Sequence, residues 1–186
     1  MSTFSATRMT SEQFLAMGED PPGLKLELAH GEILMRSSPS RGHSLVVFAL
    51  VELLSPYIRR EGLGALYGDT GTVLDDWNTR RPDLIFVSRS QARIVGEIVL
   101  TGAPELCVEV ISAGTERIDR EEKFALYEER GVKNYWIFDP RARIAEAYVL
   151  KRGAYVLAAS AGGKRIVRFP PFPKLDINLG MVWPAK

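Results

Sequence analysis

The stretch Leu106-Cys107-Val108-Glu109-Val110-Ile111 is apolar at every position except Glu109. A second run, residues 83–87, is apolar after its first residue, Asp83. Continuous apolar runs of this length, unlike alternating ones, are typical of strands that are covered on both faces. The two runs therefore predict the centre of a mixed sheet with helices packed against it.

The segments around these two strands complete an α/β chain with an α+β mixed sheet flanked by helices. A capping-box pattern at residues 10–13 predicts a short helix, and apolar spacing over residues 46–58 predicts a longer amphipathic one. A charged helix is expected over residues 115–130, ending at Gly131. Further strands are expected at residues 24–28, 33–36, 63–67, 72–74, 135–138, 144–150 and 155–159.

Length and composition indicate one soluble domain. The 186 residues suit a single domain, with a core at residues 10–150 and a C-terminal hairpin and extended tail at residues 151–186. Three prolines between residues 170 and 173 suggest that the tail lies over the surface. The N-terminal ten residues lack the apolar core of a signal peptide, and no apolar segment is long enough to cross a membrane. We expect a cytoplasmic protein.

Charge and cysteine content exclude some classes of function. The net charge of +1 gives no global attraction for nucleic acid, so any DNA contact needs a local basic patch. Cys107 is the only cysteine, which excludes an intrachain disulfide and a multi-cysteine zinc site. Because it lies in an apolar run, Cys107 is interpreted as a small core residue and not as a nucleophile.

Two carboxylates stand out in the predicted sheet. Asp83 follows Pro82 at the entrance to one strand, and Glu109 shares a strand face with Cys107 and Ile111. A buried ionised carboxylate is costly unless it is paired or binds a metal. A strand-initiating turn would also explain Asp83, and an ion pair with an internal arginine or lysine would also explain Glu109.

If the two carboxylates lie close together, a bound cation is one way to offset their electrostatic repulsion. Two such charges about 4 Å apart repel by roughly 4 kcal/mol at an effective dielectric constant near 20. Either one carboxylate takes up a proton, or a cation sits between them. Hard oxygen ligands with few histidines suit Mg²⁺ or Mn²⁺ better than zinc, and such a metal polarises phosphoryl oxygens.

Other polar residues could join such a site. Asp119, Lys123 and Tyr127 fall at spacings of four and line one face of the predicted helix, although a solvated charged stripe has the same pattern. Glu27 lies between Leu26 and Leu28 in a predicted strand. His43 lies near the start of the long helix, where a structural or surface role is the alternative.

An ordered series of short motifs spans most of the chain, from about residue 10 to residue 150. The series is Leu26-Glu27-Leu28, His30-Gly31-Glu32, His43, Arg81-Pro82-Asp83, Val108-Glu109-Val110-Ile111-Ser112, Asp119, Lys123, Tyr127, Gly131-Val132, Tyr135-Trp136 and Asp139-Pro140. As an ordered set it resembles the Uma-type family of restriction-endonuclease-like proteins, within the PD-(D/E)XK nuclease superfamily. The resemblance implies a restriction-endonuclease-like fold, dependence on a divalent metal and hydrolysis of phosphodiester bonds.

The resemblance also assigns roles to residues. Asp83 corresponds to the carboxylate of the first half-motif and Glu109 to that of the second, and the Val110 carbonyl completes the protein's part of the metal shell. The superfamily pattern has a lysine two residues after the second carboxylate, where this chain has Ile111. Lys123 is the expected replacement, reaching the site from the following helix.

Supporting roles fall to three of the remaining candidates. Tyr127 is expected to hydrogen-bond the attacking water or the lysine, while Glu27 and His43 border the site. Six arginines lie nearest these motifs in sequence and are candidates for contacting the phosphate backbone. They are Arg36, Arg41, Arg59, Arg60, Arg80 and Arg81.

These observations lead to one main hypothesis and two rivals. The main one is an endonuclease using Mg²⁺ or Mn²⁺ on nucleic acid, with double-stranded DNA as the expected substrate. Cutting both strands with one site per chain would favour a homodimer. The first rival is a catalytically inactive scaffold that binds nucleic acid or protein. The second is a glycoside hydrolase using the two carboxylates as acid and base, which the few aromatic residues disfavour.

Overall fold

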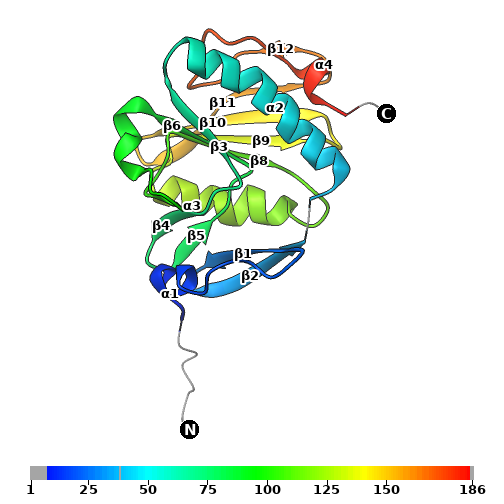
Figure 1. Cartoon of the computed structure of the whole chain (residues 1–186). Coiled ribbons are helices and arrows are strands. Elements are labelled where there is room, and N and C mark those ends of the chain that lie inside the picture. The colour runs from blue at the N-terminus through cyan, green and yellow to red at the C-terminus, as the bar shows by residue number, and fades with distance from the viewer. Residues whose placement is uncertain (1–7, 38, 185–186) are drawn as a thin grey trace.

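A six-stranded sheet is the main element of the computed structural model, which describes residues 8–37 and 39–184 (Figure 1). Its strand order is β11-β10-β9-β8-β6-β3. The strands are β3 (Gly64–Gly68), β6 (Leu84–Ser88), β8 (Leu106–Val110), β9 (Asn134–Asp139), β10 (Ile144–Lys151) and β11 (Ala154–Gly162). The two apolar runs become β6 and β8, which are neighbours near the centre as predicted.

The pairing directions decide which strand ends meet. β6 and β8 are antiparallel, with Leu84 opposite Val108, so the start of β6 lies beside the end of β8. β8 and β9 are parallel, and the β10–β11 hairpin continues the sheet on that side. All five residues of β8 are buried, as expected for a strand covered on both faces.

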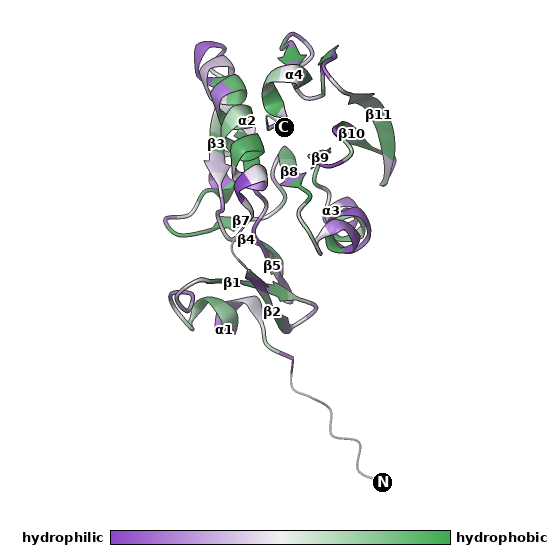
Figure 2. Ribbon diagram, turned by 90° about the vertical axis from the view of Figure 1, so that its right-hand side faces the viewer, coloured by the Kyte–Doolittle hydropathy of each residue, from purple (hydrophilic) through white to green (hydrophobic). Residues whose placement is uncertain are grey.

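Helix α2 (Arg41–Arg60) covers one face of this sheet (Figure 2). Ser40 caps its start, because the Ser40 hydroxyl accepts a hydrogen bond from the His43 N–H at 3.2 Å. Its buried side chains recur at helical spacing and pack on β6 and β8. The helix thus confirms the amphipathic pattern, and its N-terminal turn lies close to the strand ends that carry Asp83.

The opposite face is covered by α3 (Lys123–Glu129), which follows a π-helical turn, η2 (Ile118–Glu122) (Figure 2). The sequence predicted one continuous helix over residues 115–130, so the regular helix is shorter than expected. A π turn accommodates one extra residue and frequently marks a functional site. Here it holds Asp119 and leads directly into Lys123, both of which are fully buried.

A second, five-stranded sheet has the order β2-β1-β5-β4-β7 within the described residues. Its β1–β2 hairpin and the preceding helix α1 confirm the predicted elements, including the capping box between Thr10 and Gln13. The short β5 and β7 were not predicted, nor was the 3₁₀ helix η1 (Arg89–Ile94). The elements are α1 (Ser11–Leu15), β1 (Leu24–Ala29), β2 (Glu32–Ser37), β4 (Thr72–Asp75), β5 (Asn78–Arg80) and β7 (Leu100–Thr101).

The C-terminal tail does not simply lie over the surface as predicted, because it inserts several apolar side chains into the core while its other positions stay exposed. Phe169 and Phe172 are fully buried beside Trp136, whose Nε1–H donates to the Pro170 carbonyl at 2.7 Å. Proline prevents a long regular strand here but does not prevent burial of the side chains between the prolines. The tail also forms β12 (Ile166–Val167), β13 (Ile177–Asn178) and α4 (Leu179–Val182).

The expectation of no signal peptide rests mainly on residues 1–7, which lie outside the described residues. Among the helices that the structure does describe, none is both long and apolar enough to cross a membrane. Cys107 is buried as predicted.

Candidate active site

Asp83 ties together three elements of the fold. Its Oδ2 accepts a hydrogen bond from the Val110 N–H at 2.7 Å and lies 3.0 Å from His43 Nε2. Asp83 lies just before β6, which begins at Leu84. Its carboxylate accepts the Val110 hydrogen bond at the point where the pairing of β6 with β8 ends. Burial alone would raise the pKa of Asp83, but the hydrogen bond and charge of His43, the charge of Lys123 and the Val110 N–H together lower it below its usual value. The carboxylate is therefore held ionised and fixed in direction.

Glu109 lies one residue from this contact and is fully buried. Its Oε1 accepts hydrogen bonds from Lys123 Nζ at 2.7 Å and from the Tyr127 hydroxyl at 2.9 Å. Its Oε2 is buried without a hydrogen-bond partner among the described residues. Burial raises the pKa of Glu109 to about 8, although the Lys123 ammonium opposes this. The protein thus satisfies one oxygen of this carboxylate and leaves the other open.

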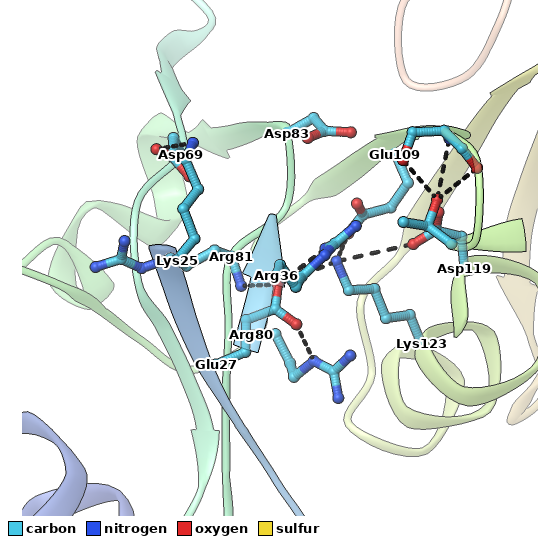
Figure 3. Close-up of polar contacts among 12 residues, drawn as sticks. Lys25, Glu27, Arg36, Asp69, Arg80, Arg81, Asp83, Glu109, Asp119 and Lys123 are labelled. Atoms are coloured by element: carbon cyan, nitrogen blue, oxygen red, sulfur yellow. Dashed lines mark hydrogen bonds and ion pairs between the residues drawn. The ribbon is translucent and has the colours of Figure 1, made fainter. Parts of the chain in front are cut away.

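Lys123 is shared by three carboxylates (Figure 3). Its Nζ lies 2.7 Å from Glu109, 3.3 Å from Glu27 and 3.9 Å from Asp119. Burial would lower the pKa of Lys123, but Glu109 and Glu27 raise it above its usual value. Lys123, Tyr127 and Asp119 are all fully buried, so the alternative of a solvated stripe is wrong.

Glu27 anchors the opposite side of the cluster from β1. Its oxygens lie 3.1 Å from an Arg36 guanidinium nitrogen and 3.0 Å from Arg80 Nε, and Oε1 also accepts from the Arg81 N–H at 3.1 Å. Burial would raise the pKa of Glu27, but the charges of Lys123, Arg80 and Arg36 lower it to about 2. Glu27 is therefore a permanent anion that holds these cations in place.

The depressed pKa of Glu27 predicts a specific acid sensitivity. Because the folded value of about 2 lies below the ordinary 4.5, the stabilisation is complete above pH 4.5 and is lost as the pH falls toward 2. The difference corresponds to about 3 kcal/mol. Urea unfolding between pH 2.5 and 5 should show that wild type loses more stability than Glu27→Gln. Parallel pH profiles for the two proteins would contradict the assignment.

A pocket of about 310 Å³ opens beside these residues. Asp83, His43, Glu27 and Arg36 line it, whereas Glu109 and Lys123 lie behind its wall. Most of the remaining lining comes from the start of α2, the β1–β2 hairpin and the loop at residues 112–115, and Asp69, Arg81 and Ile118 complete it. A ligand in the pocket would thus meet Asp83 first, with the buried acidic cluster behind it.

Not every predicted basic residue lies near the site. Arg59 and Arg60 lie at the far end of α2, about 24 Å along the helix from His43 at 1.5 Å per residue. Arg80 is 1% exposed and cannot meet a phosphate backbone, because it is packed against Glu27. The expectation is therefore wrong for Arg80, whereas Arg59 and Arg60 are exposed but lie away from the pocket. Arg36 and Arg81 do line the pocket, paired with Glu27 and Asp20 respectively.

The sequence missed two features of the cluster. Arg80 was not recognised as a partner of Glu27, because it lies on the three-residue strand β5, too short to give a strand pattern. Asp119 was given no role, yet both of its oxygens are buried without a hydrogen-bond partner among the described residues. Its i,i+4 spacing from Lys123 was the available signal.

The donor set fits a divalent metal ion in its chemistry. The described residues contain no group of three or more His, Cys, Asp or Glu side chains placed to hold a metal by themselves. Mg²⁺ needs fewer, because it is usually bound by one or two carboxylates and keeps waters or substrate phosphates as its other ligands. Asp83 and the open Oε2 of Glu109, with the Val110 carbonyl, match that requirement.

Comparison with known proteins identifies a family and a shared fold. A family model described as "Uma2: Putative restriction endonuclease" matches residues 11–180. Among solved structures, the chain is similar to "a putative nuclease belonging to DUF820 from Anabaena variabilis ATCC 29413". The TM-score is 0.77 at 16% sequence identity, covering 94% of this chain and 97% of that one. No curated protein matches. At this identity, the solved structure establishes a shared fold.

Proposed function

The chain belongs to the Uma2 family and has its restriction-endonuclease-like fold, and from this premise we propose that it is a metal-dependent endonuclease acting on DNA. Family and structural neighbour both support a nuclease-like function. The observation that carries the proposal is that Asp83 and Glu109 lie at adjacent strand ends, with the Lys123 ammonium 2.7 Å from Glu109.

Proteins of the restriction-endonuclease-like type generally use divalent metals. In this chain Asp83, Glu109 and the Val110 carbonyl would hold Mg²⁺ or Mn²⁺. When bound, such an ion polarises a phosphoryl oxygen and makes a water molecule more acidic. The negative charge of Asp83 at the pocket, with the open oxygen of Glu109 behind it, is what would draw the ion to this place.

The surrounding residues fix the two carboxylates in direction. His43 and the Val110 N–H both bind Oδ2 of Asp83, which leaves Oδ1 for another ligand. Lys123 and Tyr127 both donate to Oε1 of Glu109, which leaves Oε2. Each carboxylate therefore has one oxygen assigned to the protein and one left for a ligand, a preorganisation that catalytic sites require.

Lys123 contributes a fixed positive charge beside the pocket. Glu27 holds the ammonium from the side opposite Glu109, so the long side chain has little freedom to leave. A cation in this position offsets negative charge that builds up on the phosphorus-bound oxygens in the transition state. In this way Lys123 would replace the lysine that the superfamily pattern places at Ile111. A twofold pair of chains would bring one such site to each strand of a duplex.

Removal of divalent metal tests the proposal directly. We expect the purified protein to cut DNA oligonucleotides in Mg²⁺ or Mn²⁺, and to stop cutting when a chelator is added. Product ends and time courses from gel electrophoresis check this, and Asp83→Asn purified in parallel controls for contaminating nucleases. Cleavage that persists in chelator would contradict metal dependence, and no cleavage of any DNA in either metal would contradict the nuclease assignment.

A non-catalytic scaffold is a second candidate, and one observation favours it. Glu109 is fully buried and does not line the pocket, and Ile111 stands where the superfamily has its lysine. Such a scaffold would bind nucleic acid or protein without turnover and would show weak or no affinity for metal. Calorimetric titration with Mn²⁺ separates the two, because the enzyme requires binding that Asp83→Asn weakens.

A further inference from the structure

An exposed aromatic ring stands at the edge of the candidate active-site pocket. Phe48 is 66% exposed and lines the same pocket as His43 and Asp83. It lies on α2 five residues after His43, and its neighbour Val47 also lines the pocket. The pocket lining is thus apolar along this part of α2, while Asp83, Glu27 and Asp69 make other parts of it acidic.

The charges that line the pocket nearly cancel. Arg36 pairs with Glu27, Arg81 with Asp20, and Lys25 with Asp69. A groove that binds duplex DNA through its backbone needs unpaired cations, because neutralising phosphates supplies most of that affinity. Three cations and three carboxylates line this pocket, leaving little net positive charge for phosphate. They are Lys25, Arg36 and Arg81, and Glu27, Asp69 and Asp83.

We propose that Phe48 stacks on an unpaired nucleobase next to the phosphate to be cut, so that the preferred DNA is single-stranded or opened at that position. This inference rests on the proposed nuclease function. Aromatic side chains bind single strands by stacking on base faces, a contribution that works with any base and does not itself depend on phosphate charge. In an intact duplex both faces of a base are covered by its neighbours, so a ring can reach one only after the base leaves the stack.

The size of the pocket agrees with one nucleotide. Its volume of about 310 Å³ lies at the small end of the range for pockets that enclose a single small ligand. Asp83 and Phe48 line this one cavity, so a base on the ring and its phosphate near the carboxylate would occupy it together. Continuity of the apolar lining with the acidic site therefore favours a nucleotide over a separate protein partner.

Binding without cleavage tests the inference independently of catalysis. We expect the wild-type protein, in chelator, to bind a fluorescently labelled single strand more tightly than the fully paired duplex of the same sequence, as measured by anisotropy. Phe48→Ala should weaken single-strand binding about tenfold or more, whereas Phe48→Tyr, which keeps the ring, should bind like wild type. Trp77→Ala is the matched control, because Trp77 is 41% exposed and does not line this pocket.

The outcomes separate this inference from the proposed function. If the protein cuts paired duplex faster than single strands and Phe48→Ala leaves both binding and cutting unchanged, the inference is wrong and the nuclease assignment stands. If single strands bind through Phe48 but nothing is cut in Mg²⁺ or Mn²⁺, the nuclease assignment fails instead. If Phe48→Ala changes the mass measured by light scattering and not strand binding, this face joins two copies of the chain and the inference is wrong.

Discussion

Asp83→Asn should lower the rate of DNA cleavage by about a hundredfold to a thousandfold and change the free energy of unfolding by about 1 kcal/mol or less. Asparagine has the same shape, and its amide oxygen can still accept the hydrogen bond from the Val110 N–H. What the substitution removes is the negative charge that holds a divalent ion and keeps His43 oriented. The loss therefore falls on catalysis and not on folding.

Single-turnover cleavage and urea unfolding measure the two effects on the same preparation. Asp69→Asn is the matched control, since Asp69 also lines the pocket but is half exposed and pairs with Lys25. We expect that control to cleave within a fewfold of wild type, because exposed ion pairs contribute little. If Asp83→Asn kept more than a tenth of the wild-type rate, the central role given to Asp83 would be wrong.

Local sequence pattern predicts the centre of this fold well and its edges poorly. β6 and β8 are apolar at most positions, Glu109 being the exception within β8, and are buried along almost their whole length, so pattern and burial coincide. β5 and β7 have three and two residues, too few to show a period. The burial of Phe172 depends on a contact with Trp136, 36 positions away in the chain, which no local pattern encodes.

The candidate site also combines residues that local pattern identifies with contacts that depend on distant parts of the chain. The sequence identified Asp83 and Glu109 because a carboxylate beside an apolar strand is locally conspicuous, and the structure brings both to adjacent strand ends. Lys123 was placed by resemblance alone, since an exposed helix stripe would have the same spacing. The pairing of Glu27 with Arg80 could not be predicted, because it depends on the antiparallel pairing of β1 with β5, a strand too short to show a pattern.

Burial of Lys123 makes it the residue whose loss should affect both stability and activity. In Lys123→Met, Glu109, Glu27 and Asp119 lose the cation they share. Removing one partner of a buried ion pair costs about 3–5 kcal/mol, because the remaining charge is left uncompensated. We also expect DNA cleavage to fall by about a hundredfold or more, since the fixed positive charge beside the pocket is gone.

The sign of the pH dependence distinguishes this explanation from a simple packing defect. In wild type the pKa of Glu109 already stands at about 8, above its ordinary 4.5, and removing Lys123 takes away the charge that opposes the rise. A carboxyl whose folded pKa is raised stabilises the fold at low pH and loses that contribution as the pH rises through the folded value. Relative to wild type, urea unfolding should therefore show Lys123→Met losing more stability at about pH 9.5, above the wild-type pKa of Glu109, than at about pH 7. A packing defect would cost the same at both.

Two further variants test whether Lys123 stabilises the fold by compensating buried negative charge. Adding Glu109→Gln to Lys123→Met should recover part of the lost stability, because the buried charge is removed with its partner. Cleavage should stay lost, since Glu109 is proposed to bind the metal. Lys133→Met is the control for removing a lysine, because Lys133 is exposed and pairs with Glu105, so its loss should cost about 1 kcal/mol or less. If the double variant were no more stable than Lys123→Met, charge compensation by Lys123 would not be what holds this acidic cluster together.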